Sequence, residues 1–145
     1  MEDFDDNNIH DGMPVDWYTT GSYWDIGGGD LYWNSSASSA GQCSHPTFTA
    51  ADFEAEYDLS ADDYYNATRW AGFCFRKNNY SDSYNDSGYM FFYRYNGDIH
   101  LLKPFDNLIA TVSTGLWLNT TRHIKLRVKG TNIKVWVDNT LYIDT

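Results

Sequence analysis

The fold class is decided by the stretch Ile124-Lys125-Leu126-Arg127-Val128-Lys129-Gly130-Thr131-Asn132-Ile133-Lys134-Val135-Trp136-Val137-Asp138. On both sides of the central Gly130-Thr131-Asn132, an aliphatic residue occupies every second position, which is the period of a strand that buries one face. Glycine and asparagine accept the positive φ angles that a tight connection needs. The stretch therefore predicts a β-hairpin with one face in a core and the other in water.

Strands of the same kind are predicted along the rest of the chain. Phe53 to Leu59 alternates apolar with acidic residues, and Asn96-Gly97-Asp98 is a turn between two apolar runs. The other predicted strands are Tyr23–Ile26 and Leu31–Trp33 around a glycine-rich loop, Trp70–Arg76, Gly88–Tyr95, Ile99–Lys103 and Leu141–Ile143. About nine short strands with regularly spaced turns predict an all-β, two-sheet antiparallel β-sandwich, in a single domain over residues 1–145.

The charge of the chain disfavours two classes of partner. Its formal net charge is -10 at pH 7, so the long-range field repels the phosphates of nucleic acids and anionic lipid surfaces. The sequence has no run of about 18 apolar residues that would span a bilayer, and its first residues lack the basic and apolar regions of a signal peptide. We therefore expect no nucleic acid and no membrane as partner.

Aromatic residues make up 18% of the chain, with 12 Tyr and 6 Trp among them. A core of this size needs fewer, so we expect some of the rings to face solvent. An exposed Tyr or Trp offers a flat apolar face with a polar tip, against which a sugar ring can stack. The alternative for any single ring is an ordinary aromatic-rich sandwich surface.

Several strand motifs follow one another in an order that is typical of a known group of modules. They are Phe4-Asp5-Asp6, Trp24-Asp25-Ile26-Gly27 to Leu31, Phe53-Glu54-Ala55-Glu56, Ala71-Gly72-Phe73-Cys74-Phe75-Arg76, Gly88-Tyr89-Met90, Gly97-Asp98-Ile99-His100-Leu101 and the hairpin from Val128 to Asp138. In this order the chain resembles the concanavalin-like (laminin-G or jelly-roll) modules of polysaccharide-degrading enzymes. Within that group it is most similar to the family 66 carbohydrate-binding modules, which accompany fructan hydrolases.

The resemblance implies a non-catalytic carbohydrate-binding module and not an enzyme. It implies a secreted, monomeric part of a larger multidomain glycoside hydrolase, which the module targets to a polysaccharide or oligosaccharide, a fructan such as levan. Such modules continue past the element Tyr142-Ile143-Asp144 into a further glycine-rich strand, whereas this chain stops at Thr145. Either the domain lacks that final C-terminal strand, or the first strands sit differently, or another segment supplies it.

Three acidic residues, Glu54, Glu56 and Asp58, share one face of a predicted strand. Glycosidases use paired carboxylates, so a glycoside hydrolase or lyase on the same fold is an alternative function. The order departs from the Glu, apolar, Asp, apolar, Glu motif of family 16 glycoside hydrolases, and we favour cross-strand pairing with the basic face formed by His123, Lys125, Arg127 and Lys129. A laminin-G-like adhesion domain is a further alternative.

A sugar-binding site is predicted at the end of the strand Trp70–Arg76. If Phe73 and Phe75 point into the core, alternation sends Arg76 outward beside the polar loop Lys77–Ser87. A guanidinium group can hold two adjacent hydroxyls, and nearby phenols complete the hydrogen bonding. The predicted carbohydrate-binding residues are Arg76, Lys77, Tyr80, Tyr89, Tyr93 and Lys103. The alternative is that Arg76 only pairs with an acidic neighbour such as Asp82.

Two further features concern a metal ion and the cysteines. Asp5 and Asp6, with Asp144, could supply oxygen ligands to a structural Ca²⁺, although most acidic termini are simply solvated. We expect no other cofactor. Cys43 and Cys74 are too few for a four-ligand zinc site, so they form either one disulfide or two buried thiols, and an extracellular location favours the disulfide.

Overall fold

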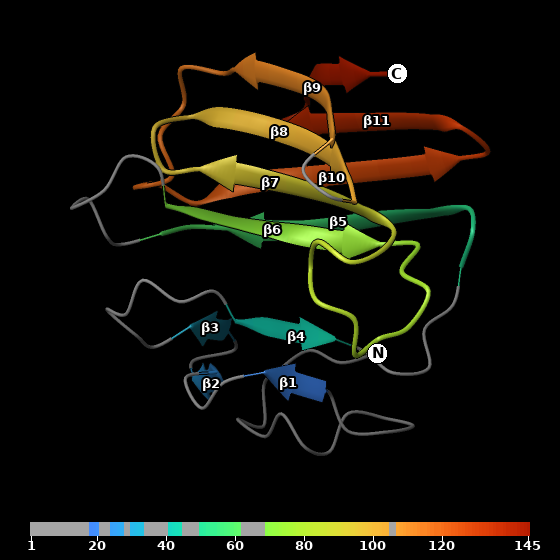
Figure 1. The fold of residues 1–145 in the computed structure, drawn as a ribbon. Helices are drawn as coiled ribbons and strands as arrows, with labels where there is room; N and C mark the ends of the chain where they lie inside the picture. The colour runs from blue at the N-terminus through green and yellow to red at the C-terminus, as the bar shows by residue number, and fades with distance from the viewer. Residues whose placement is uncertain are drawn as a thin grey trace. The chain divides into compact units, whose positions relative to one another are not determined.

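The computed structural model describes residues 18–20, 24–27, 30–33, 41–44, 50–61, 69–104 and 107–145 (Figure 1). The chain divides into two compact units. The first unit contains Met1–Thr49 with Asn78–Tyr84, and the second contains Ala50–Lys77 with Asn85–Thr145. Among the described residues there is no helix long and apolar enough to cross a membrane.

The second unit is built from two four-stranded antiparallel sheets, one in front of the other in Figure 1. The β5 sheet has the order β12-β11-β10-β5, and the β6 sheet has the order β6-β7-β8-β9. The strands of the first are β5 (Phe53–Leu59), β10 (Arg122–Lys129), β11 (Asn132–Val137) and β12 (Thr140–Asp144); those of the second are β6 (Trp70–Phe75), β7 (Tyr89–Arg94), β8 (Asp98–Lys103) and β9 (Asn107–Ser113). This architecture confirms the predicted all-β, two-sheet sandwich.

The core lies between the two sheets and is formed by the inward positions of each strand. Strands β10 and β11 pair as the predicted hairpin, with Ile124 opposite Val137 and Leu126 opposite Val135. The completely buried side chains come from both sheets: Phe91, Tyr93, Ile99 and Leu101 on one side, and Ile124, Leu126, Val135 and Val137 on the other. Alternation along each strand therefore places one layer of side chains from each sheet in a common core.

The outer face of the β5 sheet carries the expected pairs of opposite charge. The Lys125 ammonium lies 2.7 Å from a carboxylate oxygen of Glu54 and 2.8 Å from one of Glu56. His123 Nδ1 lies 2.8 Å from Asp58 Oδ1. The acidic face of β5 is therefore used in cross-strand pairing with β10, as predicted from the sequence.

The outer face of the β6 sheet carries a row of aromatic rings that the sequence analysis did not single out. The ring of Phe92 on β7 lies 5.5 Å from Trp70 on β6, and it stacks on His100 of β8 with the ring centroids 4.6 Å apart and the planes 8° from parallel. The guanidinium of Arg94 lies 5.7 Å from the centre of the Phe92 ring. Packing around Phe92 thus shields part of His100 from water.

The described strands of the first unit form two short antiparallel pairs. Strand β2 (Trp24–Gly27) pairs with β3 (Asp30–Trp33), which confirms the hairpin predicted around the glycine-rich loop. Strand β1 (Tyr18–Thr20) pairs with β4 (Gln42–Ser44). Trp24 and Trp33 face each other across the first pair, with an edge-to-face contact at 5.3 Å.

The predicted disulfide is not formed in the structure, in which Cys43 and Cys74 are both free thiols. Cys43 lies on β4 of the first unit, and Cys74 lies on β6 of the second. Burial raises the pKa of Cys43 to about 12 and that of Cys74 to about 11, so both stay protonated at neutral pH. The structure therefore agrees with the alternative given from the sequence, two thiols, and both are partly buried.

Two neighbouring residues of β10 should differ sharply in their effect on stability. Leu126 is completely buried between the sheets, so Leu126→Ala should lower the free energy of unfolding by about 2–5 kcal/mol. Lys125→Ala removes only side-chain contacts on the outer face and should change the free energy of unfolding much less. Urea unfolding of both variants measures the difference, and equal losses would contradict the assignment of the two faces.

The stability of the protein should fall as His100 becomes protonated. Burial, and then the positive charge of Arg94, lower the pKa of His100 below its ordinary value, against the opposing effect of Asp98. As pH falls through about 6.5, the unfolded chain therefore takes up this proton before the folded chain does, and the folded state loses stability. Unfolding free energies measured between about pH 7.5 and pH 5 should decrease less in His100→Gln than in the parent. Identical slopes for the two proteins would show that His100 is not shielded in this way.

Candidate functional site

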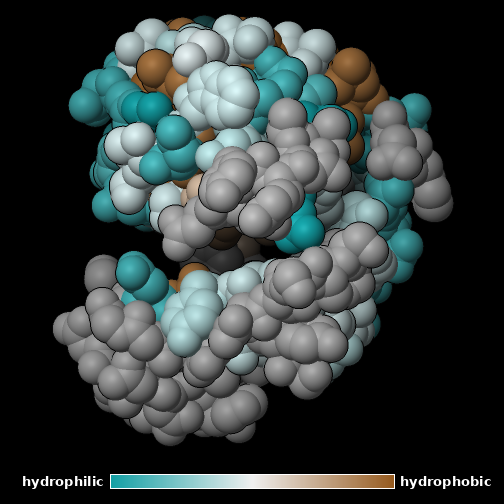
Figure 2. All heavy atoms as spheres, turned by 90° about the vertical axis from the view of Figure 1, so that its left-hand side faces the viewer, coloured by the Kyte–Doolittle hydropathy of each residue, from teal (hydrophilic) through white to brown (hydrophobic). Residues whose placement is uncertain are grey.

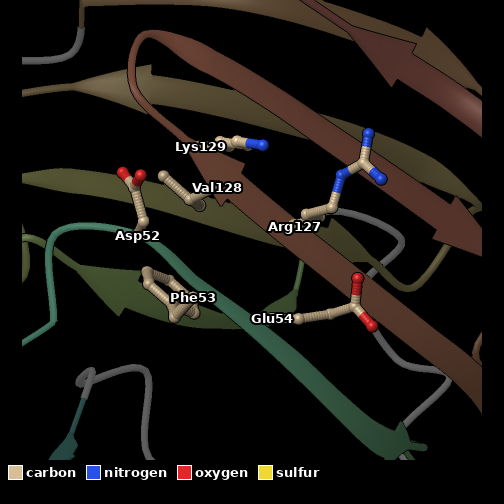
Figure 3. Close-up of a pocket in the computed structure, with 6 residues that line it drawn as sticks. All are labelled: Asp52, Phe53, Glu54, Arg127, Val128 and Lys129. Atoms are coloured by element: carbon tan, nitrogen blue, oxygen red, sulfur yellow. The ribbon is translucent and has the colours of Figure 1, made fainter.

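A shallow groove lies where the beginning of β5 meets the end of β10 (Figure 3). It has a volume of about 240 Å³. Its lining comes from two short segments: Asp52, Phe53 and Glu54 from one, and Arg127, Val128 and Lys129 from the other. The antiparallel register brings them together, because Phe53 is opposite Val128 and Glu54 is opposite Arg127.

The groove combines an apolar floor with charged groups at its rim. Phe53 and Val128 are the inward residues of their strands, and Phe53 packs edge-to-face on the core residue Phe75 at 5.7 Å. Figure 3 shows the side chains of Asp52 and Lys129 near one end of the groove and those of Glu54 and Arg127 near the other. A small apolar surface with a few polar groups around it is the usual composition of a site for a small organic ligand.

The Asp52 carboxylate is held in place by groups from two other segments of the second unit. Its Oδ1 accepts a hydrogen bond from the backbone N–H of Gly130 at 2.8 Å and lies 3.2 Å from Nη2 of Arg76. Nε of Arg76 donates to the carbonyl oxygen of Ala51 at 2.6 Å. Arg76 thus joins the end of β6 to the beginning of β5, and one wall of the groove is fixed between the two sheets.

The predicted orientation of Arg76 is wrong, and the reason is its backbone conformation. Phe75 lies in the core as expected, but Arg76 has a φ of 52°, which ends the strand alternation on which the prediction was based. The side chain therefore turns toward Asp52 on the other sheet and not away from the sandwich. The alternative, that Arg76 pairs with an acidic residue, is confirmed, but the partner is Asp52 and not Asp82, which was given as the example.

Two other predicted residues, Tyr89 and Lys103, meet at the same end of the β6 sheet. The ammonium of Lys103 lies 5.9 Å from the centre of the Tyr89 ring, and that ring stacks on Phe75 with centroids 5.5 Å apart. Because Phe75 also contacts Phe53, the aromatic contacts continue to the floor of the groove. Tyr89 therefore does not line the groove but packs against Phe75, which in turn contacts Phe53.

Tyr93 cannot contact a sugar, which corrects its assignment to the site. Its side chain is completely buried, and its hydroxyl donates to the carbonyl oxygen of Leu116 at 2.6 Å. Burial raises its pKa above the ordinary value for tyrosine. In the strand Tyr89–Arg94, Tyr93 points to the core for the same reason as Phe91, because the two are separated by one residue.

The last two predicted residues, Lys77 and Tyr80, belong to different units. Lys77 follows Arg76 in the second unit and is half-buried. Tyr80 is in the first unit, where its exposed ring makes an edge-to-face contact with Tyr18 at 5.3 Å. The loop around Tyr80 also borders a polar pocket of the first unit, of about 260 Å³, lined by Thr20, Gly41, Gln42, Ser81, Ser83 and Tyr84.

The sequence analysis did not identify Asp52, Phe53, Val128 and Lys129 as neighbours in one site. The charge patterns predicted that the two strands pair, but they did not fix the register that sets Phe53 opposite Val128. One residue beside the groove has a signal in the sequence, the glycine at position 130. Glycine readily adopts the φ of 57° with which this residue presents its N–H to Asp52.

The predicted calcium ligands fall into two groups. Asp5 and Asp6 lie outside the described residues. The carboxylate of Asp144 accepts hydrogen bonds from the ammonium of Lys134 at 2.6 Å and the amide of Asn132 at 2.9 Å, and these contacts lower its pKa. The described ranges contain no group of three or more His, Cys, Asp or Glu side chains arranged to hold a metal ion.

Comparison with known proteins identifies the fold. No family model matches the chain, and a search of curated proteins finds no match. Among solved structures, the carbohydrate-binding module CBM66 from Bacillus subtilis is similar, with a TM-score of 0.63 and 20% sequence identity over 89% of this chain and 78% of that module. The similarity confirms the fold that the sequence motifs predicted.

Removing the Arg76 side chain should affect stability. Arg76→Ala loses the hydrogen bond to Ala51 and the ion pair with Asp52 between the two sheets, so the free energy of unfolding should fall by about 1–2 kcal/mol. Arg76→Lys keeps the charge but not the planar fork, and it should recover only part of the loss. Thermal and urea unfolding measure both variants. An Arg76→Ala protein as stable as the parent would show that this contact does not join the sheets in solution.

Proposed function

We propose that this chain is a carbohydrate-binding module that holds a neutral sugar in the groove between β5 and β10 and does not transform it. The composition of the groove carries the proposal. The partly exposed ring of Phe53 at the floor of the groove suits the C–H face of a sugar ring, and the charged groups of the rim suit its hydroxyls. The similarity in fold to a carbohydrate-binding module supports the same reading.

The rim offers both kinds of hydrogen-bonding group that a ring of hydroxyls needs. Asp52 and Glu54 accept hydrogen bonds, whereas Arg127 and Lys129 donate them. Arg127 is positioned by its contact with Trp136, whose ring centre lies 5.7 Å from the guanidinium carbon. Each hydrogen bond replaces one with water, so we expect weak binding, in the micromolar to millimolar range.

A catalytic role for the carboxylates of β5 is disfavoured by their contacts. A glycosidase needs one carboxylic acid that keeps its proton near neutral pH. The pKa of Glu56 is lowered, chiefly by its hydrogen bond and charge interaction with Lys125, so this residue is ionised. Glu54 contacts the same ammonium, and Asp58 contacts His123. These pairs support a module that binds without catalysis.

The resemblance to the family 66 modules suggests a ligand and a setting for this activity. The ligand would be a fructan such as levan, and the module would be part of a larger secreted glycoside hydrolase that it brings to the polysaccharide. The net charge of -10 fits a neutral polysaccharide better than an acidic one. For the same reason, binding should change little with salt concentration.

Removal of the donors of the rim should weaken binding. In the double variant Arg127→Ala/Lys129→Ala, affinity for levan-type oligofructosides should fall by about 10-fold or more, because the acceptors of the sugar lose two donors. Lys134→Ala is the matched control, since it removes a cation from the same sheet outside the groove. Calorimetric titration measures affinity, and melting curves check that all proteins are folded.

Two results would count against the proposed function. If the parent binds no member of a panel of neutral fructo-, gluco-, xylo- and manno-oligosaccharides, the chain is not a module for neutral sugars. If the parent binds and the groove variant binds equally well, the site is elsewhere on the molecule.

A further inference from the structure

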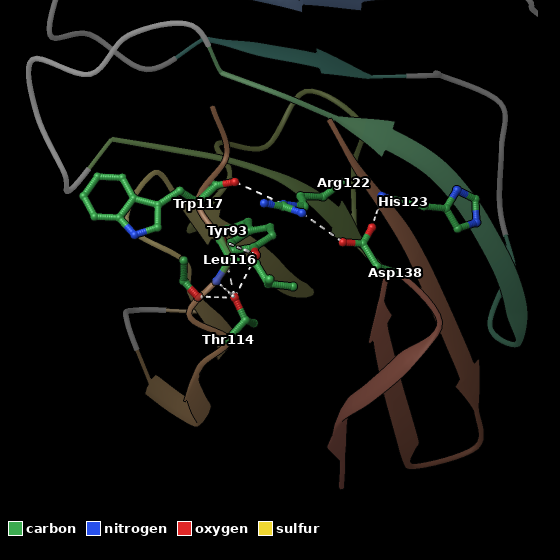
Figure 4. Close-up of polar contacts among 8 residues, drawn as sticks. Tyr93, Thr114, Leu116, Trp117, Arg122, His123 and Asp138 are labelled. Carbon is green, nitrogen blue, oxygen red and sulfur yellow. Dashed lines mark hydrogen bonds and ion pairs between the residues drawn. The ribbon is translucent and has the colours of Figure 1, made fainter. Parts of the chain in front are cut away.

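Tyr93 decides which side chains of β7 face outward. It is completely buried, and its hydroxyl donates to the carbonyl oxygen of Leu116 at 2.6 Å and lies 2.8 Å from Oγ1 of Thr114 (Figure 4). Because side chains alternate along a strand, its neighbours Phe92 and Arg94 point away from the core. Strand β7 lies between β6 and β8, so both side chains are in the middle of the outer face of the β6 sheet.

The register of the strands places two rows of residues across this face. Cross-strand partners point to the same side of a sheet, so each row can be followed from β6 to β9. The first row is Trp70, Arg94, Asp98 and Ser113, and the second is Gly72, Phe92, His100 and Thr111. We call these residues the platform. With neighbouring strands about 4.8 Å apart, each row is roughly 14 Å long.

Within the platform, a hydrogen-bond donor lies directly beside an exposed ring. Trp70 and Arg94 are opposite each other in the ladder between β6 and β7. Both lie against Phe92, with 5.5 Å between the ring centroids of Trp70 and Phe92 and 5.7 Å from the guanidinium carbon to the Phe92 ring centre. Trp70 remains 37% exposed, whereas Phe92 is buried. Phe92 thus holds the indole and the guanidinium next to each other.

The guanidinium of Arg94 has hydrogen-bonding capacity that the described residues do not use. Its Nε is buried without a hydrogen-bonding partner, and none of the described residues forms an ion pair with it. Nε2 of His100, which stacks on Phe92, is likewise buried without a partner. Folded proteins leave few buried polar groups unpaired, and those that remain are often found at functional sites. A fixed cation with unused donors also loses little freedom when a ligand binds.

The charges of the platform favour a neutral ligand. Asp98 offsets the positive charge of Arg94, since hydrogen bonds, first of all from Ser113, lower its pKa and keep it ionised. His100 is uncharged at neutral pH, because burial and then the charge of Arg94 lower its pKa. Thr111 and Ser113 add exposed residues with hydroxyls at the β9 end of the rows. A ring, a fixed donor and hydroxyls without a net charge suit the C–H face and the hydroxyls of a sugar.

The composition of the surface favours a polysaccharide over a protein partner. Among the platform residues, Trp70 is the one large apolar side chain that is exposed. On the side of the molecule shown in Figure 2, the coloured surface is mostly hydrophilic or intermediate, and hydrophobic side chains lie in separate places. A stable protein partner needs about 800 Å² from each side with an apolar centre, which one indole does not supply.

We propose that the platform is a second sugar-binding site, on which a neutral polysaccharide chain lies across the strands of the β6 sheet. Trp70 stacks on one sugar ring, and the guanidinium of Arg94 donates hydrogen bonds to the hydroxyls of that ring. Thr111 and Ser113 contact a later ring of the same chain at the β9 end. The proposal rests on the proposed function for the class of ligand.

The platform and the groove are separate sites. Strand β6 begins at Trp70 and ends at Phe75, which contacts Phe53 in the floor of the groove. At about 3.3 Å per residue, these ends are roughly 16 Å apart, so one sugar ring cannot contact both sites. A polymer held at one site presents further sugars to the other at a high effective concentration. The protein should therefore bind a long polymer at least about 10-fold more tightly than a short oligosaccharide.

The number of oligosaccharides bound by the full chain tests the platform. Calorimetric titration with levan-type oligofructosides long enough to cross the sheet, and in parallel with gluco-, xylo- and manno-oligosaccharides of similar length, should give two per chain for the parent. Trp70→Ala should leave one, and Arg127→Ala/Lys129→Ala should leave the platform as the remaining site. Trp117→Ala is the matched control, because it removes a tryptophan that is 49% exposed outside both sites and should leave two.

A second variant keeps the test decisive if Trp70→Ala does not fold. Arg94→Gln removes a guanidinium whose Nε has no hydrogen-bonding partner among the described residues, so the fold should be retained. The affinity of the platform should fall by about 10-fold or more, because the sugar loses charged donors, while the groove keeps its affinity. Arg94→Lys keeps the charge but not the planar fork, and it should recover only part of the loss. Melting curves show whether each variant is folded.

The possible results separate the platform from the proposed function. One oligosaccharide per chain that is lost in the groove variant and kept in Trp70→Ala and Arg94→Gln overturns the platform and leaves the proposed function in place. One that is lost in Trp70→Ala and Arg94→Gln but kept in the groove variant supports the platform and overturns the groove. No binding of any sugar by the parent overturns both. Equal losses in Trp70→Ala and Trp117→Ala would show that the position of Trp70 on the platform is not what matters, and would overturn the platform.

Discussion

The antiparallel pairing of β5 with β10 is the constraint on which the second unit depends. It sets Phe53 opposite Val128 at one end and Leu59 opposite Arg122 at the other. With this register the aliphatic residues of β10 enter the core and its cations meet the carboxylates of β5. A shift by one residue would place the charged side chains inside and the aliphatic ones in water, so the register is strongly specified. The groove lies at one end of this pair of strands.

The parts of the fold that follow from alternation were predictable from the sequence. The hairpin from Ile124 to Asp138 has the predicted buried face, and its turn is one residue shorter than predicted, because Asn132 already pairs with Lys129. The acidic pattern of Phe53 to Leu59 and the basic pattern of Ile124 to Lys129 were each visible, and their complementary charges indicated that the two strands are neighbours. Local pattern decides such features, because each strand must bury one side of itself.

The candidate site was predicted only in part, because it depends on places where alternation ends. Arg76 adopts a positive φ one residue beyond its strand, which turns its side chain to Asp52 on the other sheet. Tyr93 looked like a ligand-binding phenol, whereas its hydroxyl fixes the loop that carries Trp117. Neither fact has a local signal, since both require knowledge of which distant segment lies beside the residue. The two free cysteines lie in different units, a division that their even number does not reveal.

The proposed function places a neutral sugar at the end of the β5 and β10 pair. The most direct measurement is a titration of isotope-labelled protein with levan-type oligofructosides, followed by amide chemical shifts in NMR spectra. The largest shifts are expected at residues 52–54 and 127–130. Shifts confined to the outer face of the β6 sheet, around Phe92 and His100, would contradict this placement.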